Sequence, residues 1–201
     1  RLSRGLGDVY KRQLFDEKIL EKGAQIVKDV NREVAEIIGI NPAARTTCVK
    51  PSGNASVLLQ TASGIHAEHS SMYIRNVQMN KESEITQAIM KTNPYMVEDS
   101  VWSAGGTDVV VSFPILPNKG SMYKDDLLGI KHLELVKKAQ KHWVEVGTNE
   151  ELCADEGIRH NVSNTIIVDD WDEVEKYVFE NRDAFAGISF LAMTGDKDYN
   201  Q

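Results

Sequence analysis

The chain has 201 residues, of which 41% are hydrophobic and 26% charged, and its formal net charge is −7. This composition is typical of a globular protein with one or two domains. The acidic balance argues against a protein that coats nucleic acid or an anionic membrane, so we expect no nucleic-acid polymer and no membrane among its partners. It does not argue against a small anionic ligand, because local donors decide such binding.

The cysteines and the apolar runs point to a reducing compartment. Cys48 and Cys153 are far apart and lack CxxC spacing, which predicts neither a zinc site nor a disulfide framework. No apolar run approaches the roughly 20 residues that span a bilayer. The first residues also lack the apolar core of a secretory signal. We therefore expect a cytoplasmic protein without a metal site.

The first residues are expected to lie outside the fold. Asp8–Gln13 reads DVYKRQ, which is the in-frame translation of an end sequence in adapters used for sequencing libraries. We interpret residues 1–13 as an artefact and residues 14–201 as a portion of a longer chain that is incomplete at both ends.

The first half of the chain alternates helices with short strands. From Leu14 onward, apolar residues recur every three or four positions, and Gly39 and Pro42 then stop the helix. The elements predicted next are strand Thr46–Val49, helix Asn54–Gln60, strand Met72–Gln78 and helix Glu82–Lys91.

The second half continues the alternation. Its predicted elements are a strand at residues 107–115, a long helix Tyr123–Val146, strand Ser163–Val168, a helix that begins after Asp170, and strand Gly187–Leu191. Asp170 and Glu173 form a predicted capping box, and Trp143 and Trp171 fall on predicted core faces. Strands that alternate with helices favour an α/β fold with mostly parallel pairing.

One strand-to-helix corner is rich in hydrogen-bond donors. Ser52, Gly53, Asn54, Ala55 and Ser56 follow a predicted strand, where ligands bind in α/β folds. The first amides of a helix are unpaired and suit a phosphate. The alternative is an ordinary solvated turn, because Ser, Gly and Asn are common turn residues. Spacing alone favours the turn.

Two longer stretches resemble a known family. They read RTTCVKPSGNASVLLQTASGIHAEHSSMYIRNVQMNK and RHNVSNTIIVDDWDEVEKYVFENRDAFAGISFL. Both are similar to the catalytic barrel of ribonucleotide reductases, and most similar to the adenosylcobalamin-dependent (class II) ribonucleoside-triphosphate reductases. The resemblance implies part of a ten-stranded α/β barrel. It also implies an enzyme that converts ribonucleoside triphosphates, or diphosphates, to 2′-deoxyribonucleotides for DNA synthesis by thiyl-radical chemistry.

The resemblance further implies a role for the corner. Ser52, Gly53, Asn54, Ala55 and Ser56 match the family's phosphate-binding positions, although many members have Thr where this chain has Asn54. The implied cofactor is adenosylcobalamin, and the implied reductant is a dithiol such as thioredoxin. The radical cysteine and the redox cysteines match no residue here, so we expect no catalytic residue in this chain. Cys48 is expected to be a buried strand residue.

Three alternatives are weighed against these expectations. The first is the large subunit of an iron-dependent ribonucleoside-diphosphate reductase, but Phe190-Leu191 stands where that family has a tyrosine pair. The second is a non-catalytic module that binds nucleotide phosphates. The third concerns His66, Glu68 and His69, which could bind a metal, although a polar loop is the favoured interpretation.

Overall fold

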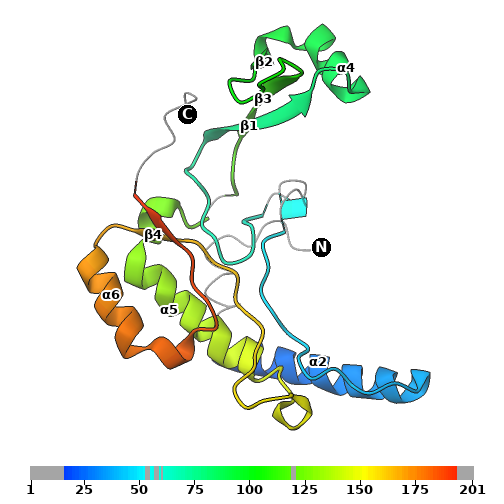
Figure 1. Ribbon diagram of the computed structural model, residues 1–201, viewed down its shortest axis with the longest axis vertical. Coiled ribbons are helices and arrows are strands. Elements are labelled where there is room, and N and C mark those ends of the chain that lie inside the picture. The colour runs from blue at the N-terminus through cyan, green and yellow to red at the C-terminus, as the bar shows by residue number, and fades with distance from the viewer. Residues whose placement is uncertain (1–15, 53–54, 57–58, 60, 119–120, 194–201) are drawn as a thin grey trace. The chain divides into compact units, whose positions relative to one another are not determined.

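The computed structural model describes residues 16–52, 55–56, 59, 61–118 and 121–193. These residues form two compact units (Figure 1). Unit 1 contains the described residues up to Glu68 and from Asn118 onward, and unit 2 contains His69–Pro117. Among the described residues, none of the helices combines the length and the low polarity that a membrane span requires.

Unit 1 begins with the long helix α2 (Glu17–Ile38). The Asp16 side chain caps it by accepting a hydrogen bond of 3.2 Å from the Ile19 amide. The helix ends at Gly39, whose φ of 73° is left-handed and whose amide donates to the carbonyls of Ala35 and Glu36. The predicted helix and its glycine stop are therefore confirmed.

The core of unit 1 lies between helices and short parallel strands. Helix α5 (Gly129–Ala139) continues directly into the π-helical turn η3 (Gln140–Glu145). Strand β4 (Ile166–Val168) pairs in parallel with β5 (Phe190–Ala192), and α6 (Trp171–Glu180) lies between them in sequence. The buried side chains that share this core are Ile65, Leu133, Val136, Ala139, Val144, Val162, Ile166, Val168 and Val174.

Unit 2 is a small antiparallel sheet with one helix. Strand β3 (Asp108–Ile115) lies between β1 (Tyr73–Asn80) and β2 (Val97–Asp99). Helix α4 (Glu84–Thr92) follows β1 and is capped by Ser83. Val109, Val110 and Val111 are buried at the centre of the sheet.

The segments of unit 1 that precede and follow unit 2 in the sequence are paired with each other. The Glu68 amide donates to the Met122 carbonyl at 2.9 Å, and the Lys124 amide donates to the Glu68 carbonyl at 2.8 Å. These bonds form a parallel bridge between Glu68 and Tyr123, so the two ends of the excursion are held together within unit 1. Short 3₁₀ turns elsewhere occupy Pro94–Met96, Lys124–Asp126, Glu150–Leu152 and Arg182–Ala184.

Mixed α/β content is confirmed, but the expected sheet is not. The described residues form a three-stranded antiparallel sheet and a two-stranded parallel sheet, and these small sheets do not show the expected partial ten-stranded barrel. The predicted strands at Met72–Gln78 and 107–115 pair with each other and not with parallel neighbours. Alternation of helices and strands does not reveal this, because a hairpin with an inserted helix gives the same order.

Three local predictions were wrong. The helix predicted from Tyr123 begins at Gly129, because a 3₁₀ turn precedes it. Trp171 is 52% exposed, since it is the first residue of α6 and lies beside Phe190 and not in the core. Cys48 is exposed, because the neighbouring Thr47 takes the buried side of this extended segment.

Candidate functional site

The extended segment before the corner is anchored on both sides. The Thr46 amide and hydroxyl both donate to the Gly147 carbonyl, at 2.9 and 2.7 Å. On the other side, Val49 forms a parallel bridge with Val162, and the Ser163 amide donates to the Val49 carbonyl at 2.9 Å. The predicted strand Thr46–Val49 is therefore present only as bridges, yet its carboxyl end is fixed in unit 1.

Contacts with residues 143–147 also fix this segment. The Thr47 hydroxyl donates to the Trp143 carbonyl at 2.7 Å, and the Trp143 indole donates to the Cys48 carbonyl at 3.1 Å. A Cβ atom added to Gly147 would lie 1.9 Å from the Thr47 hydroxyl oxygen. Only glycine fits at this position, so the end of η3 packs directly against the strand that leads to the corner.

Two of the described amides in the corner have internal partners. The Ser52 amide donates to the Ser63 hydroxyl at 3.1 Å, and the Ala55 amide donates to the Ser52 carbonyl at 3.2 Å. Ser52 and Ala55 are exposed, whereas Ser56 is 4% exposed. Gly53 and Asn54 lie outside the described residues.

The loop after the corner folds back over the end of the strand. Gly64 has a φ of 58°, and a Cβ atom there would lie 3.0 Å from the Lys50 carbonyl oxygen. Ser63, which accepts from Ser52, precedes this glycine. We did not predict roles for Ser63 or Gly64, although the Ser-Gly pair was a visible sign of a tight turn.

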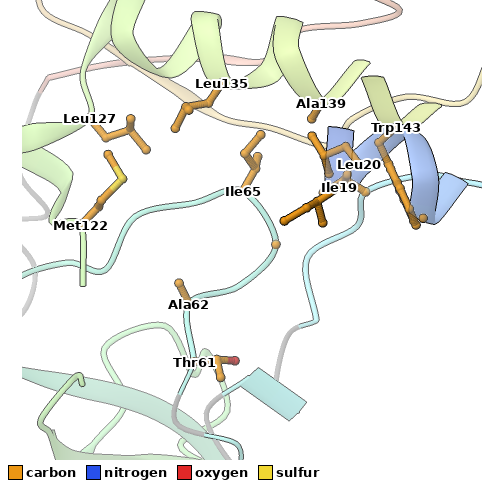
Figure 2. Close-up of a pocket in the computed structure, with 13 residues that line it drawn as sticks. Ile19, Leu20, Thr61, Ala62, Ile65, Met122, Leu127, Leu135, Ala139 and Trp143 are labelled. Carbon is orange, nitrogen blue, oxygen red and sulfur yellow. The ribbon is translucent and has the colours of Figure 1, made fainter. Parts of the chain in front are cut away.

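Residues of this loop line one side of a cavity of about 400 Å³. Figure 2 shows side chains of α2, α5 and the loop around it, including Leu20, Ile65 and Leu135. The other lining residues are Ile19, Gly23, Val49, Thr61, Ala62, Gly64, Met122, Leu127, Ala139 and Trp143. Thr61 is the one side chain with a hydroxyl in this lining, so the cavity suits apolar atoms.

The histidine loop packs against the buried His132. His66 lies edge-on to the buried His132, with ring centroids 6.0 Å apart, and the His132 ring contacts the Ile65 carbonyl at 3.1 Å. In the part of the chain that the structure describes, no three His, Cys, Asp or Glu side chains are grouped to hold a metal. Side-chain oxygens of Gln140, Asn149 and Asn161 are buried without a hydrogen bond.

Among the described residues, Tyr177 has a side-chain pKa that departs clearly from its ordinary value. Burial raises the pKa of its phenol well above the ordinary value, and the adjacent carboxylate of Glu134, to which the phenol donates, raises it further. Tyr177 packs beside the core from α6. This group therefore stabilises the contact between α5 and α6 and lies outside the candidate site.

The comparisons with known proteins identify the relatives of this chain. It is 28% identical over 131 residues to a probable adenosylcobalamin-dependent ribonucleoside-triphosphate reductase of Dictyostelium discoideum. It is 26% identical over 145 residues to the adenosylcobalamin-dependent ribonucleoside-triphosphate reductase of Euglena gracilis. The resemblance seen in the sequence is confirmed. A scan against models of protein families gives no match.

The fold comparison agrees with these relatives. The crystal structure of a B12-dependent (class II) ribonucleotide reductase matches 93% of this chain with a TM-score of 0.72 and 19% sequence identity. At this identity the match establishes the fold alone. The chain spans 16% and 20% of the Dictyostelium and Euglena reductases and 24% of the crystallised chain, so the likeness to the reductases is partial.

Proposed function

We propose that this chain is part of an adenosylcobalamin-dependent ribonucleoside-triphosphate reductase and that its corner binds the phosphates of the substrate. The observation that carries the proposal is the sequence likeness, over 131 and 145 residues, to proteins named as such reductases. The reaction is the conversion of ribonucleoside triphosphates to 2′-deoxyribonucleotides for DNA synthesis, and a dithiol such as thioredoxin supplies the reducing equivalents.

The contribution of this chain is to position the substrate. Exposed Ser52 and Ala55 present backbone and hydroxyl groups at the end of an anchored strand. Because the amides of Ser52 and Ala55 already have internal acceptors, we expect these amides to share their hydrogen bonds with the phosphates. Fixing the phosphates at the corner lowers the entropy that is lost at the reacting ribose.

The described residues do not fit the cobalamin cofactor. A corrin carries several amide groups that need polar partners, whereas the 400 Å³ cavity is lined almost entirely by apolar side chains. We therefore place the cofactor on the rest of the longer polypeptide.

A full-length hybrid tests the proposal. In this hybrid, the chain replaces the matched segment of the Euglena gracilis relative, and reduction is measured with adenosylcobalamin and a dithiol. We expect Gly53→Val to raise the KM for the ribonucleoside triphosphate about tenfold or more, because charged hydrogen bonds contribute roughly 1.5–3 kcal/mol each. Gly105→Val is the control, because the nearest atom to its Cβ would be a Thr107 methyl group at 3.8 Å.

Three outcomes would contradict the proposal. An unchanged KM in the Gly53→Val hybrid would remove the phosphate role of the corner. Activity that depends on an iron-containing radical subunit, and not on adenosylcobalamin, would replace the proposed class with the iron-dependent one. A hybrid that binds the triphosphate but never reduces it would favour a non-catalytic phosphate-binding module.

A further inference from the structure

The apolar stripe of α2 faces away from the core of its own unit. Helices of globular proteins normally bury this stripe. Here the side chains on it are more than half exposed, namely Ile19 at 52%, Ile26 at 52%, Val30 at 51% and Ile37 at 75%. We call these four residues the α2 stripe. They recur at intervals of seven, four and seven residues, so they form one line about 27 Å long.

The side of α2 that packs against unit 1 combines small and polar residues with the partly buried Leu20 and Val27. Ala24 and Ala35 are buried, and a Cβ added to Gly23 would lie 3.1 Å from the Trp143 ring. Lys28 donates to the Thr148 carbonyl at 3.1 Å, and Asn31 accepts from the Ala43 amide at 2.8 Å. The contacts of α2 with the rest of unit 1 are thus already satisfied, and they leave the α2 stripe uncovered.

The α2 stripe continues into the apolar cavity. Ile19 belongs to both, and Figure 2 shows it beside Leu20 and Trp143 at the end of the cavity nearest α2. The parallel sheet of the same unit is also incomplete, because parallel strands are normally covered on both faces and β5 is exposed along its whole length. The α2 stripe and the cavity, which share Ile19, form an apolar surface of unit 1 that is open to further packing.

We propose that the α2 stripe is the docking face for an amphipathic helix in the part of the reductase polypeptide that lies outside this chain. The relatives argue for this occupant, since the chain corresponds to 16–20% of the Dictyostelium and Euglena proteins. A straight line of aliphatic side chains about 27 Å long matches a helix of similar length, because two helices pack along such ridges. The inference rests on the proposed function, because it takes the occupant from the same longer polypeptide.

Cysteine labelling tests the docking face. Cys48 and Cys153 are first replaced by serine, and Val30→Cys is then compared in the 201-residue chain and in the Euglena hybrid described above. We expect the rate of maleimide labelling to fall about tenfold or more in the hybrid, because a packed position reacts only after local opening. The matched control is Glu36→Cys, an exposed position about 120° around the same helix, whose labelling rate is expected to stay the same.

Two results of the labelling experiment would overturn the proposal. Equal labelling of Val30→Cys in the chain and in the folded hybrid would overturn the proposal. Labelling that slows as the concentration of the 201-residue chain rises would identify a second copy as the occupant and would also overturn it. The labelling measurement does not involve nucleotide, so it tests the docking face separately from the phosphate role. If Val30→Cys is protected and the KM of Gly53→Val is unchanged, the docking face is supported and only the phosphate role is refuted.

A second variant guards against a hybrid that fails to fold. Val30→Asp places a charge on the α2 stripe. In the 201-residue chain, we expect its thermal midpoint to equal that of the unsubstituted chain, because Val30 is 51% exposed there. A lowered midpoint would mean that the α2 stripe is already packed within the chain, which would refute the inference without any hybrid.

Discussion

The contact between Gly147 and Thr47 gives a direct test of how the strand before the corner is held. In Gly147→Ala, the new Cβ would lie 1.9 Å from the Thr47 hydroxyl oxygen, 2.6 Å from its methyl carbon and 2.7 Å from its Cβ. Thr47 is 4% exposed and cannot rotate into solvent. Overpacking of this kind costs about 1–3 kcal/mol. Displacing the hydroxyl from the Trp143 carbonyl adds about 1–3 kcal/mol, so we expect a total loss of roughly 2–6 kcal/mol.

Denaturant unfolding, followed by circular dichroism, measures this loss. Gly105→Ala is the matched control and should change the unfolding free energy by less than about 0.5 kcal/mol, because its Cβ would make only an ordinary contact. A double-mutant cycle isolates the contact, since Thr47→Gly removes all three clashing atoms. In that background, Gly147→Ala should cost less than about 1 kcal/mol. If Gly147→Ala is as costly without the Thr47 side chain as with it, the steric explanation is wrong.

Three further substitutions probe unit 1. Leu133→Ala removes a fully buried side chain and should lower the unfolding free energy by about 2–5 kcal/mol in a denaturant titration. Gly64→Ala should cost about 1–3 kcal/mol, because it combines a left-handed φ of 58° with a contact of 3.0 Å to the Lys50 carbonyl, and an unchanged midpoint would contradict this geometry. The raised pKa of Tyr177 means that the folded state keeps a proton that the unfolded state loses above its ordinary value of 10.0. Stability should therefore fall as the pH rises beyond that value, and Tyr177→Phe should weaken this alkaline loss in thermal melts; an identical pH profile would show that burial beside Glu134 does not perturb the phenol.

The sequence predicted well those features of the helices that depend on residues close together in the chain. The stripe of apolar residues and Gly39 placed α2, and Asp170 capped α6 as expected, with its carboxylate accepting from the Glu173 amide at 3.0 Å. Such features depend on contacts between residues three or four positions apart. They can therefore be predicted from spacing and residue type.

Pairing and burial were less predictable because they depend on distant segments. The antiparallel register of β1 and β3 joins residues 28 to 42 positions apart, and the exposure of Trp171 depends on what lies beside α6. For the candidate site, the residues Ser52–Ser56 were chosen from the sequence and the family resemblance. The partners that hold the corner, Ser63 and Gly64, became visible only in the fold.

The bridge between Glu68 and Tyr123 closes the loop of chain that contains unit 2. The two hydrogen bonds at this bridge join residues on either side of the 49 residues of His69–Pro117. A loop that starts and finishes at one point can change length without moving its anchor. Variation in the antiparallel sheet can thus accumulate while the segments that support the corner keep their places.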